Sequence, residues 1–165
     1  MAFLRVPTKN KLIKHLYIIA VFFKRLFYRE IMSQNIYNPR KIKKAVRAVR
    51  DIMFYKKILS DIIKYNLEKD LFFYTYWYDE VTYALQLLKE QYNFKLITRT
   101  HGHDLYEERM ETGYMPMRRM FIKQIDRVFT ITESANQYLS STYGYPPKLL
   151  TTARLGVDDL NIICS

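Results

Sequence analysis

Hydrophobic and polar positions in the second half of the chain follow two alternating periods, which predict strands and helices in turn. Short runs rich in aromatic and β-branched residues have the length of buried strands, and the segments between them carry apolar residues every three or four positions. The expected strands span 71–77, 94–100, 127–132 and 148–156, and the expected helices span 79–92, 115–126 and 133–144. This alternation predicts β-α-β units, and therefore an α/β fold with a Rossmann-like parallel sheet and flanking helices.

The first 70 residues are expected to form a basic, mainly helical segment that precedes this α/β half-domain of residues 71–165. In one expected helix, 12–27, apolar residues recur at helical spacing between Lys and Arg residues. A second begins at Asn38 and Pro39, which fit an N-cap and a first helical position. The apolar stripe of this helix continues to Asn66, but its position around the helix axis shifts along the way, which allows one break in the helix.

Basic residues are concentrated at the N-terminal end. Residues 1–50 hold 13 of the 27 Lys and Arg residues but one of the 16 acidic residues, which predicts an anionic partner such as a membrane surface, a nucleic acid or a phosphorylated ligand. The longest apolar run, Leu16 to Phe23, is much shorter than the roughly 20 residues that a membrane-spanning helix needs, and no small-residue cleavage site follows it. An amphipathic helix at a membrane interface and one packed on the domain both remain open.

Polar residues cluster where each expected strand ends. The clusters are Trp77-Tyr78-Asp79, Arg99 to Asp104, Thr132-Glu133 and Arg154 to Gly156. In open parallel sheets, ligands bind beyond the carboxyl ends of the strands, so the fold is expected to gather these residues along one rim.

Helix capping is an alternative explanation for several of these residues. Asp104 and Glu107 form a D-x-x-E variant of the capping box, Glu133 lies in an expected first helical turn, and Asp79 fits an N-cap. His101 is different, because helix formation does not require it. We therefore favour a ligand-facing role for His101.

The H-x-H-D sequence at 101–104 raises the alternative of a metal site. A catalytic zinc or iron site usually takes about three protein ligands, but the remaining histidine, His15, and the single cysteine, Cys164, lie far away along the chain. No metal is therefore expected. Nucleophilic catalysis is also disfavoured, because the sequence has no G-x-S-x-G elbow, and its four glycines argue against a Gly-rich phosphate loop.

These motifs, in this order, resemble the acceptor-side, N-terminal half of a bacterial family-4-type glycosyltransferase with the GT-B fold. A strand ending in Y-x-Y-W, one ending in R-x-H-G-x-D-L-Y, one ending in a Thr-Glu pair and a closing R-L-G-V-D follow one another between Phe72 and Asp159. The resemblance implies retaining transfer of a sugar from a nucleotide-sugar donor to a lipid-linked or polysaccharide acceptor. It implies neither a metal ion nor another cofactor.

The resemblance also implies roles for residues at the rim. His101 matches by motif a histidine that reaches into the cleft of such enzymes, which implies a catalytic role. Gly102 would allow a close backbone approach to a ligand. The residues expected to bind substrate are Arg99, Gly102, Asp104, Glu133 and Arg154.

The chain departs from the family pattern after Val157, because no second domain follows before Ser165. We therefore expect a truncated transferase that is inactive alone and needs a C-terminal donor domain or a complementary chain. The lone Cys164 fits a reducing compartment, so the expected location is cytoplasmic, with peripheral contact at the inner face of the cell membrane.

Two alternatives to a transferase remain open. One is a non-catalytic basic module that binds anionic lipid or nucleic acid, and the other is a regulatory partner of a complete transferase. Nucleic acid is the less favoured ligand, because the aromatic residues fall mainly in apolar strand and helix patterns and no nucleic-acid-binding motif is present.

Overall fold

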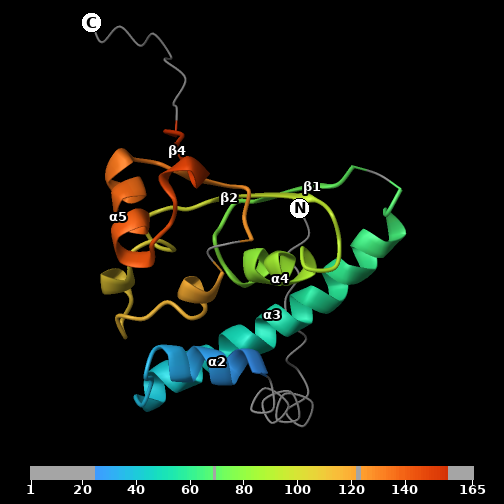
Figure 1. The fold of residues 1–165 in the computed structure, drawn as a ribbon. Coiled ribbons are helices and arrows are strands. Elements are labelled where there is room, and N and C mark those ends of the chain that lie inside the picture. The colour runs from blue at the N-terminus through green and yellow to red at the C-terminus, as the bar shows by residue number, and fades with distance from the viewer. Residues whose placement is uncertain (1–24, 69, 122–123, 156–165) are drawn as a thin grey trace, which may run out of the picture.

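The computed structural model describes residues 25–68, 70–121 and 124–155, and they form a parallel sheet with helices packed below it (Figure 1). The strands are β1 (Phe72–Thr75), β2 (Lys95–Arg99), β3 (Arg127–Thr130) and β4 (Leu150–Thr152). They lie in the order β1-β2-β3-β4, and every neighbouring pair is parallel. The predicted α/β class with a Rossmann-like parallel sheet is therefore confirmed.

Both helices that connect neighbouring strands pack on the same face of the sheet. Helix α4 (Glu80–Leu88) joins β1 to β2, and α5 (Glu133–Tyr143) joins β3 to β4. The Thr75 hydroxyl of β1 bonds Thr82 of α4, and the Thr130 hydroxyl of β3 bonds Asn136 of α5. A strand order that always advances in one direction requires this arrangement when all crossovers are right-handed.

The opposite face of the sheet is left open by the described residues. It carries Tyr74 of β1, Ile97 of β2 and Phe129 of β3, and Tyr74 is 50% exposed. Parallel sheets are usually covered on both faces, so this open face is unusual for the class.

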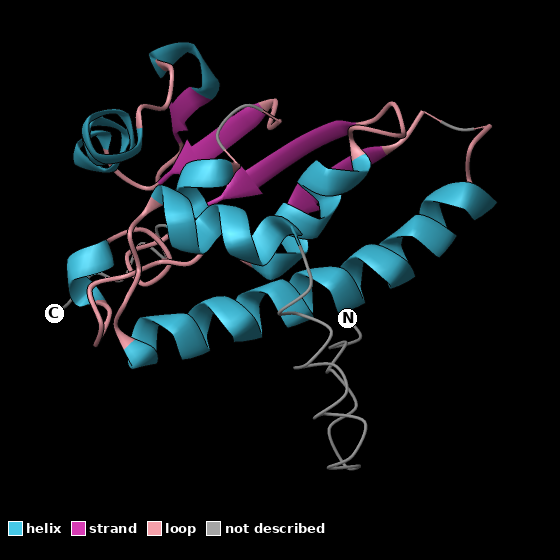
Figure 2. Cartoon of the chain, turned by 60° about the horizontal axis from the view of Figure 1, so that its bottom comes forward, coloured by secondary structure: helices cyan, strands magenta, loops and turns pink. Residues whose placement is uncertain are grey.

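The helices described before β1 form an outer layer below α4 (Figure 1), which Figure 2 turns toward the viewer. Helix α3 (Pro39–Tyr65) is one continuous helix, so the break that the pattern allowed is absent. The side chain of Asn38 accepts a hydrogen bond from the Arg40 N–H at 2.9 Å, which confirms the predicted cap. Helix α2 (Arg25–Ser33) and α3 share one hydrophobic core with the sheet. Most of the expected helix 12–27 lies outside the described residues.

Local signals at two further helix ends are also confirmed, although the expected helix 79–92 already ends at Leu88. Asp79 caps α4 by accepting a hydrogen bond from the Val81 N–H at 3.0 Å. Gly144 ends α5 in the left-handed conformation, with a φ of 73°, and its N–H reaches the carbonyls of the last helical turn. Only glycine adopts this backbone conformation at little cost, so the sequence identified this end correctly.

The expected helix 115–126 is wrong. The structure has two short 3₁₀ turns there and just before, η1 (Glu107–Arg109) and η2 (Arg118–Met120), and Met117 between them has a φ of 67°. The backbone N–H of Met117 donates to the buried Glu30 carboxylate at 2.8 Å instead of to a carbonyl within a helix. Burial raises the pKa of Glu30, and the Tyr114 hydroxyl also donates to this carboxylate. Contacts with α2 therefore replace the helical hydrogen bonds that periodicity predicted.

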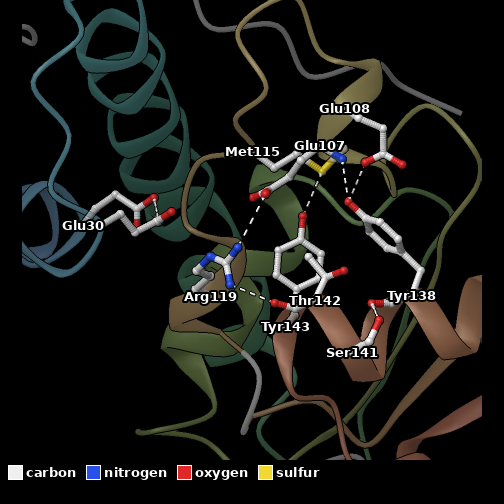
Figure 3. A network of polar contacts seen from close by, with 10 residues as sticks. Glu30, Glu107, Glu108, Met115, Arg119, Tyr138, Ser141, Thr142 and Tyr143 are labelled. Atoms are coloured by element: carbon white, nitrogen blue, oxygen red, sulfur yellow. Dashed lines mark hydrogen bonds and ion pairs between the residues drawn. The ribbon is translucent and has the colours of Figure 1, made fainter.

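Segment 107–121 is also fixed to α5 by polar contacts (Figure 3). Arg119 donates to the Thr142 carbonyl at 2.8 Å and forms an ion pair with Glu107 at 3.5 Å. The Tyr138 hydroxyl accepts from the Glu107 N–H at 3.0 Å and donates to Glu108 at 2.8 Å. The loop after β2 is thus held at both the α2 side and the α5 side.

Candidate functional site

The carboxyl ends of the four strands form one rim, as parallel pairing requires. Backbone hydrogen bonds continue just beyond the strands, from the Thr100 N–H to Phe129 and from the Ala153 N–H to Thr130. The segments that follow the strands are 76–79, 100–104, 131–133 and 153–155. All the residues expected to form the site therefore lie on this rim or on the loops that leave it.

His101 lies in a cluster of aromatic rings at the β1 and β2 end of the rim. Its ring centroid is 4.6 Å from that of Tyr76 and 4.5 Å from that of Trp77. Tyr76 and Trp77 meet nearly at right angles, with an interplanar angle of 86°. Both imidazole nitrogens of His101 are buried, and neither has a hydrogen-bond partner among the described residues. The imidazole is therefore held by stacking rather than by polar contacts.

Asp104 fixes the backbone on which His101 lies. Its carboxylate accepts hydrogen bonds from the His101 N–H and, at 3.1 Å, from the Thr100 hydroxyl. The other carboxylate oxygen accepts from the Tyr78 N–H at 2.8 Å, across the gap between the loops after β1 and β2. One carboxylate thus joins the two loops that carry the ring cluster.

The helix-capping explanation of Asp104 and Glu107 is wrong. Turn η1 follows Tyr106, and no side chain caps it. The carboxylate of Asp104 instead satisfies N–H groups at the sheet edge, and that of Glu107 pairs with Arg119. Asp104 therefore positions the rim loops.

The sequence did not single out Arg118, which holds the backbone of both rim loops through hydrogen bonds. It is almost fully buried, and one guanidinium nitrogen donates to the Tyr78 carbonyl at 2.8 Å and to the Asp104 carbonyl at 2.6 Å. The guanidinium also lies 3.9 Å from the ring centroid of Tyr78, a cation–π geometry. In the sequence, Arg118 looked like part of the polar face of a helix, so no local signal marked it.

Arg99 and Gly102 flank His101. Arg99 ends β2 and is half-buried, and its Nε has no partner among the described residues. A Cβ added to Gly102 would lie 2.5 Å from a guanidinium nitrogen of Arg109, which stacks over the Tyr106 ring at 4.5 Å. The close approach at Gly102 is thus to a side chain of the same loop.

A second polar cluster lies at the β3 and β4 end of the rim. The Glu133 carboxylate accepts from the Thr152 hydroxyl at 2.9 Å and from the Asn136 amide at 3.3 Å. Asn136, which sequence reasoning missed, also accepts from the Thr130 hydroxyl at 2.7 Å. An open pocket of about 480 Å³ has Glu133 and Asn136 in its wall.

The expected site residues therefore separate into two groups. His101 contacts the rings of Tyr76 and Trp77, Asp104 holds the loop that carries His101 and Gly102, and Arg99 ends the strand before that loop. Glu133 belongs to the second cluster. Arg154 is exposed just beyond β4. Within the described residues, no hydrogen bond or ring contact connects His101 with Glu133 or Arg154.

Glu80, at the start of α4, is another titratable group that sequence reasoning did not single out. Burial raises the pKa of its carboxyl group to about 7, and the negative charges of Asp79 and Asp51 raise it further. Asp79 has a raised pKa for the same main reason, burial. Protonation near neutral pH is thus expected beside the rim.

Neither a metal cluster nor a membrane-spanning helix is found in the described ranges. No three or more His, Cys, Asp or Glu side chains in these ranges lie close enough together to hold a metal ion. Among the helices described, none is long and apolar enough to cross a membrane.

A Rossmann-like sheet with candidate residues along its carboxyl rim is the architecture of one half of a GT-B transferase. The chain belongs to Glycosyltransferase Family 4, because the model of that family matches residues 15–159. No curated protein and no solved structure matches the chain significantly. The family confirms the resemblance at the level of a glycosyltransferase domain, which implies a nucleotide-sugar donor and an acceptor in general. It favours a transferase over the basic binding module.

Proposed function

We propose that the chain is the acceptor-side half of a retaining glycosyltransferase. It would act on a nucleotide-sugar donor and a lipid-linked or polysaccharide acceptor, as the motifs imply. The observation that carries this proposal is the placement of His101. Asp104 holds its backbone at the carboxyl rim, and both imidazole nitrogens are free of partners among the described residues.

In the proposed reaction, the bond between the anomeric carbon and the nucleotide phosphate breaks. The acceptor hydroxyl forms the new glycosidic bond on the same face of the sugar, and its proton leaves with the phosphate. His101 would bind a sugar hydroxyl close to the reacting atoms and hold it in place. Arg99 and Arg154 would add positive charge near the departing phosphate, where fixed charges lower the barrier. The proposal includes no metal ion, in keeping with the resemblance.

We infer that a C-terminal domain or a complementary chain holds the diphosphate. Arg99 and Arg154 are the basic residues among those expected at the rim, and a diphosphate clamp normally uses several charged or backbone donors. The partner would close over the rim and bring its donor site to His101.

The N-terminal layer supports a further proposal, contact with an anionic membrane surface. Arg40, Lys43 and Arg47 are exposed along one side of α3. Next to them, the turn between α2 and α3 exposes Tyr37, and α2 exposes Met32. Basic side chains beside exposed apolar ones are the combination that binds peripheral proteins to anionic lipids.

The proposed function is tested by sugar transfer to a membrane-extracted acceptor. The full chain is assayed with a panel of labelled nucleotide-sugars, with and without a C-terminal domain from a family member. We expect transfer only when that domain is present. Rapid turnover by residues 1–165 alone would contradict the proposed division of labour, and no transfer with any donor and domain would contradict the proposed function.

A further inference from the structure

Two aromatic side chains are exposed at the rim directly over the candidate histidine. Tyr76 and Trp77 are each 44% exposed, although both follow a strand of the sheet. Their rings form a corner of 86°, and the His101 ring lies within 4.6 Å of both. Water thus reaches both aromatic side chains, whereas the imidazole nitrogens that they contact are buried.

The imidazole that contacts these rings has polar atoms without hydrogen-bond partners in the described part of the chain, and so does the nearby strand end. Both nitrogens of His101 and Nε of Arg99 are buried and make no hydrogen bond within the described residues. Buried polar groups in native structures are usually paired with a hydrogen-bond partner. The two nitrogens of one imidazole, together with a third atom two residues earlier at the end of β2, indicate a place where a ligand supplies the missing partners.

The chemistry of this corner selects the kind of ligand. The ligand must have an apolar face that packs on the exposed rings. It must also have hydroxyl groups at its edge that pair with the imidazole and guanidinium nitrogens. A pyranose ring has both, because its C–H bonds lie on its faces and its hydroxyls lie around its edge. A nucleobase stacks best between parallel rings, which a perpendicular pair does not offer. An alkyl chain would leave the nitrogens unpaired.

We propose that Tyr76 and Trp77 form a stacking platform for a pyranose ring of the acceptor. The two exposed side chains turn aside far enough for one sugar hydroxyl to reach His101, and then pack on the C–H face of the ring. The acceptor therefore already carries a sugar, and an earlier glycosyl transfer must supply it. The role of the platform in transfer rests on the proposed function, whereas binding of the sugar does not.

Trp77 is the single tryptophan of the chain, so its fluorescence reports on the platform alone. The full chain is titrated with methyl glycosides of glucose, galactose, mannose and N-acetylglucosamine, with sorbitol as an open-chain polyol and with uridine. We expect a saturable change in Trp77 emission with at least one glycoside and none with sorbitol. No response to any glycoside, an equal response to sorbitol, or a larger response to uridine would overturn the proposal.

Matched variants locate the binding. Tyr76→Ala should weaken the glycoside affinity at least tenfold, and Tyr76→Phe should retain it because the ring remains. Tyr37→Ala is the control, since Tyr37 is an exposed tyrosine in the turn between α2 and α3. Far-ultraviolet circular dichroism checks that each variant is folded. Equal affinities of Tyr76→Ala and Tyr37→Ala would overturn the platform.

The failure of the platform and the failure of the proposed function give different results. If glycosides bind at Trp77 but no sugar is transferred with any added domain, the platform stands and the transferase proposal fails. If transfer occurs while Tyr76→Ala leaves the KM for the acceptor unchanged, the platform fails and the transferase proposal stands.

Discussion

At the scale of single residues, Asp104 matters more than its place in the sequence indicated. It accepts hydrogen bonds from two backbone N–H groups and from the Thr100 hydroxyl, and these contacts join the loops after β1 and β2. A D-x-x-E pattern usually indicates a helix start, but here the nearest turn has no side-chain cap. Instead, the Asp104 carboxylate accepts hydrogen bonds from N–H groups of the two loops that follow β1 and β2 at the sheet edge.

Asp104→Ala is expected to destabilise the fold and to disturb the ring cluster. Two backbone donors lose their partner, so the free energy of unfolding should fall by about 2 kcal/mol or more in urea. The emission of Trp77 should change as well. Glu108→Ala is the control, because within the described residues its carboxylate accepts one hydrogen bond, an exposed one from the Tyr138 hydroxyl, and we expect a loss below about 1 kcal/mol. Equal losses in the two variants would contradict the organising role of Asp104.

Glu80 should make stability depend on pH in a predictable direction. Its folded-state pKa of about 7 lies above the ordinary value of 4.5, mainly through burial, so the folded state holds the proton more tightly. This contribution is complete below about pH 4.5 and is lost as the pH rises through 7. Glu80→Gln should therefore match the parent at pH 4 and be more stable at pH 8, by on the order of 1–3 kcal/mol.

Urea unfolding at both pH values measures this difference. Glu111→Gln is the control, because the Glu111 side chain is 78% exposed and makes one long ion pair. We expect no comparable gain from this variant at pH 8. A Glu80→Gln variant that gains nothing between pH 4 and pH 8 would show that the carboxyl group is not held in its neutral form.

At the scale of elements, local signals predicted the strands and most helix ends. The caps at Asn38 and Asp79 and the glycine stop at Gly144 depend on neighbours in sequence, so they could be recognised without the structure. Segment 115–126 could not, because its backbone is fixed by the distant Glu30 and by the buried Arg118. Apolar periodicity carries no information about such contacts.

The candidate site was predictable to a similar extent. Strand ends and parallel pairing place His101 and Glu133 on one rim, and that part follows from the pattern alone. Asn136 and Arg118 were missed because each lies inside a segment that looked like an ordinary helix. The separation into two clusters also depends on side-chain contacts that no spacing in the sequence encodes.

The basic side of α3 gives a prediction at the same scale. The full chain should bind vesicles that contain phosphatidylglycerol, and binding should weaken as salt is raised, because screening removes the attraction. Replacing Arg40, Lys43 and Arg47 together by Gln should lower the partition coefficient at least tenfold, since each charge contributes about 1 kcal/mol near an anionic surface.

A second triple variant tests whether vesicle binding depends on the position of the basic side chains or only on the net charge of the chain. Lys95, Arg127 and Lys148 are exposed outside α2 and α3, and replacing them by Gln removes the same charge. This variant should keep most of the binding. Equal binding to neutral and anionic vesicles, or equal losses in the two triple variants, would contradict a membrane-facing side of α3.

At the scale of the whole molecule, the exposed basic side chains of α3 and the candidate site lie in different layers. Helices α2 and α3 form the outer layer on the helix side of the sheet (Figure 1). This layer carries the exposed Arg40, Lys43 and Arg47, and the loops after β1 and β2 carry the part of the rim with His101. Glu30 connects these layers, because it is buried on α2 and accepts hydrogen bonds from Tyr114 and Met117 of the loop after β2. A surface that faces the membrane would thus be rigidly connected to the proposed acceptor site.

His101 is proposed to act on the sugar during transfer, and the transfer rate of a His101 variant tests this role. Transfer by the chain together with a matching C-terminal domain is compared for the parent, His101→Ala and His103→Ala. We expect His101→Ala to lower kcat at least tenfold, or about 1.4 kcal/mol of transition-state stabilisation, while His103→Ala stays close to the parent. An unchanged kcat in a folded His101→Ala variant, or equal losses in both variants, would contradict it.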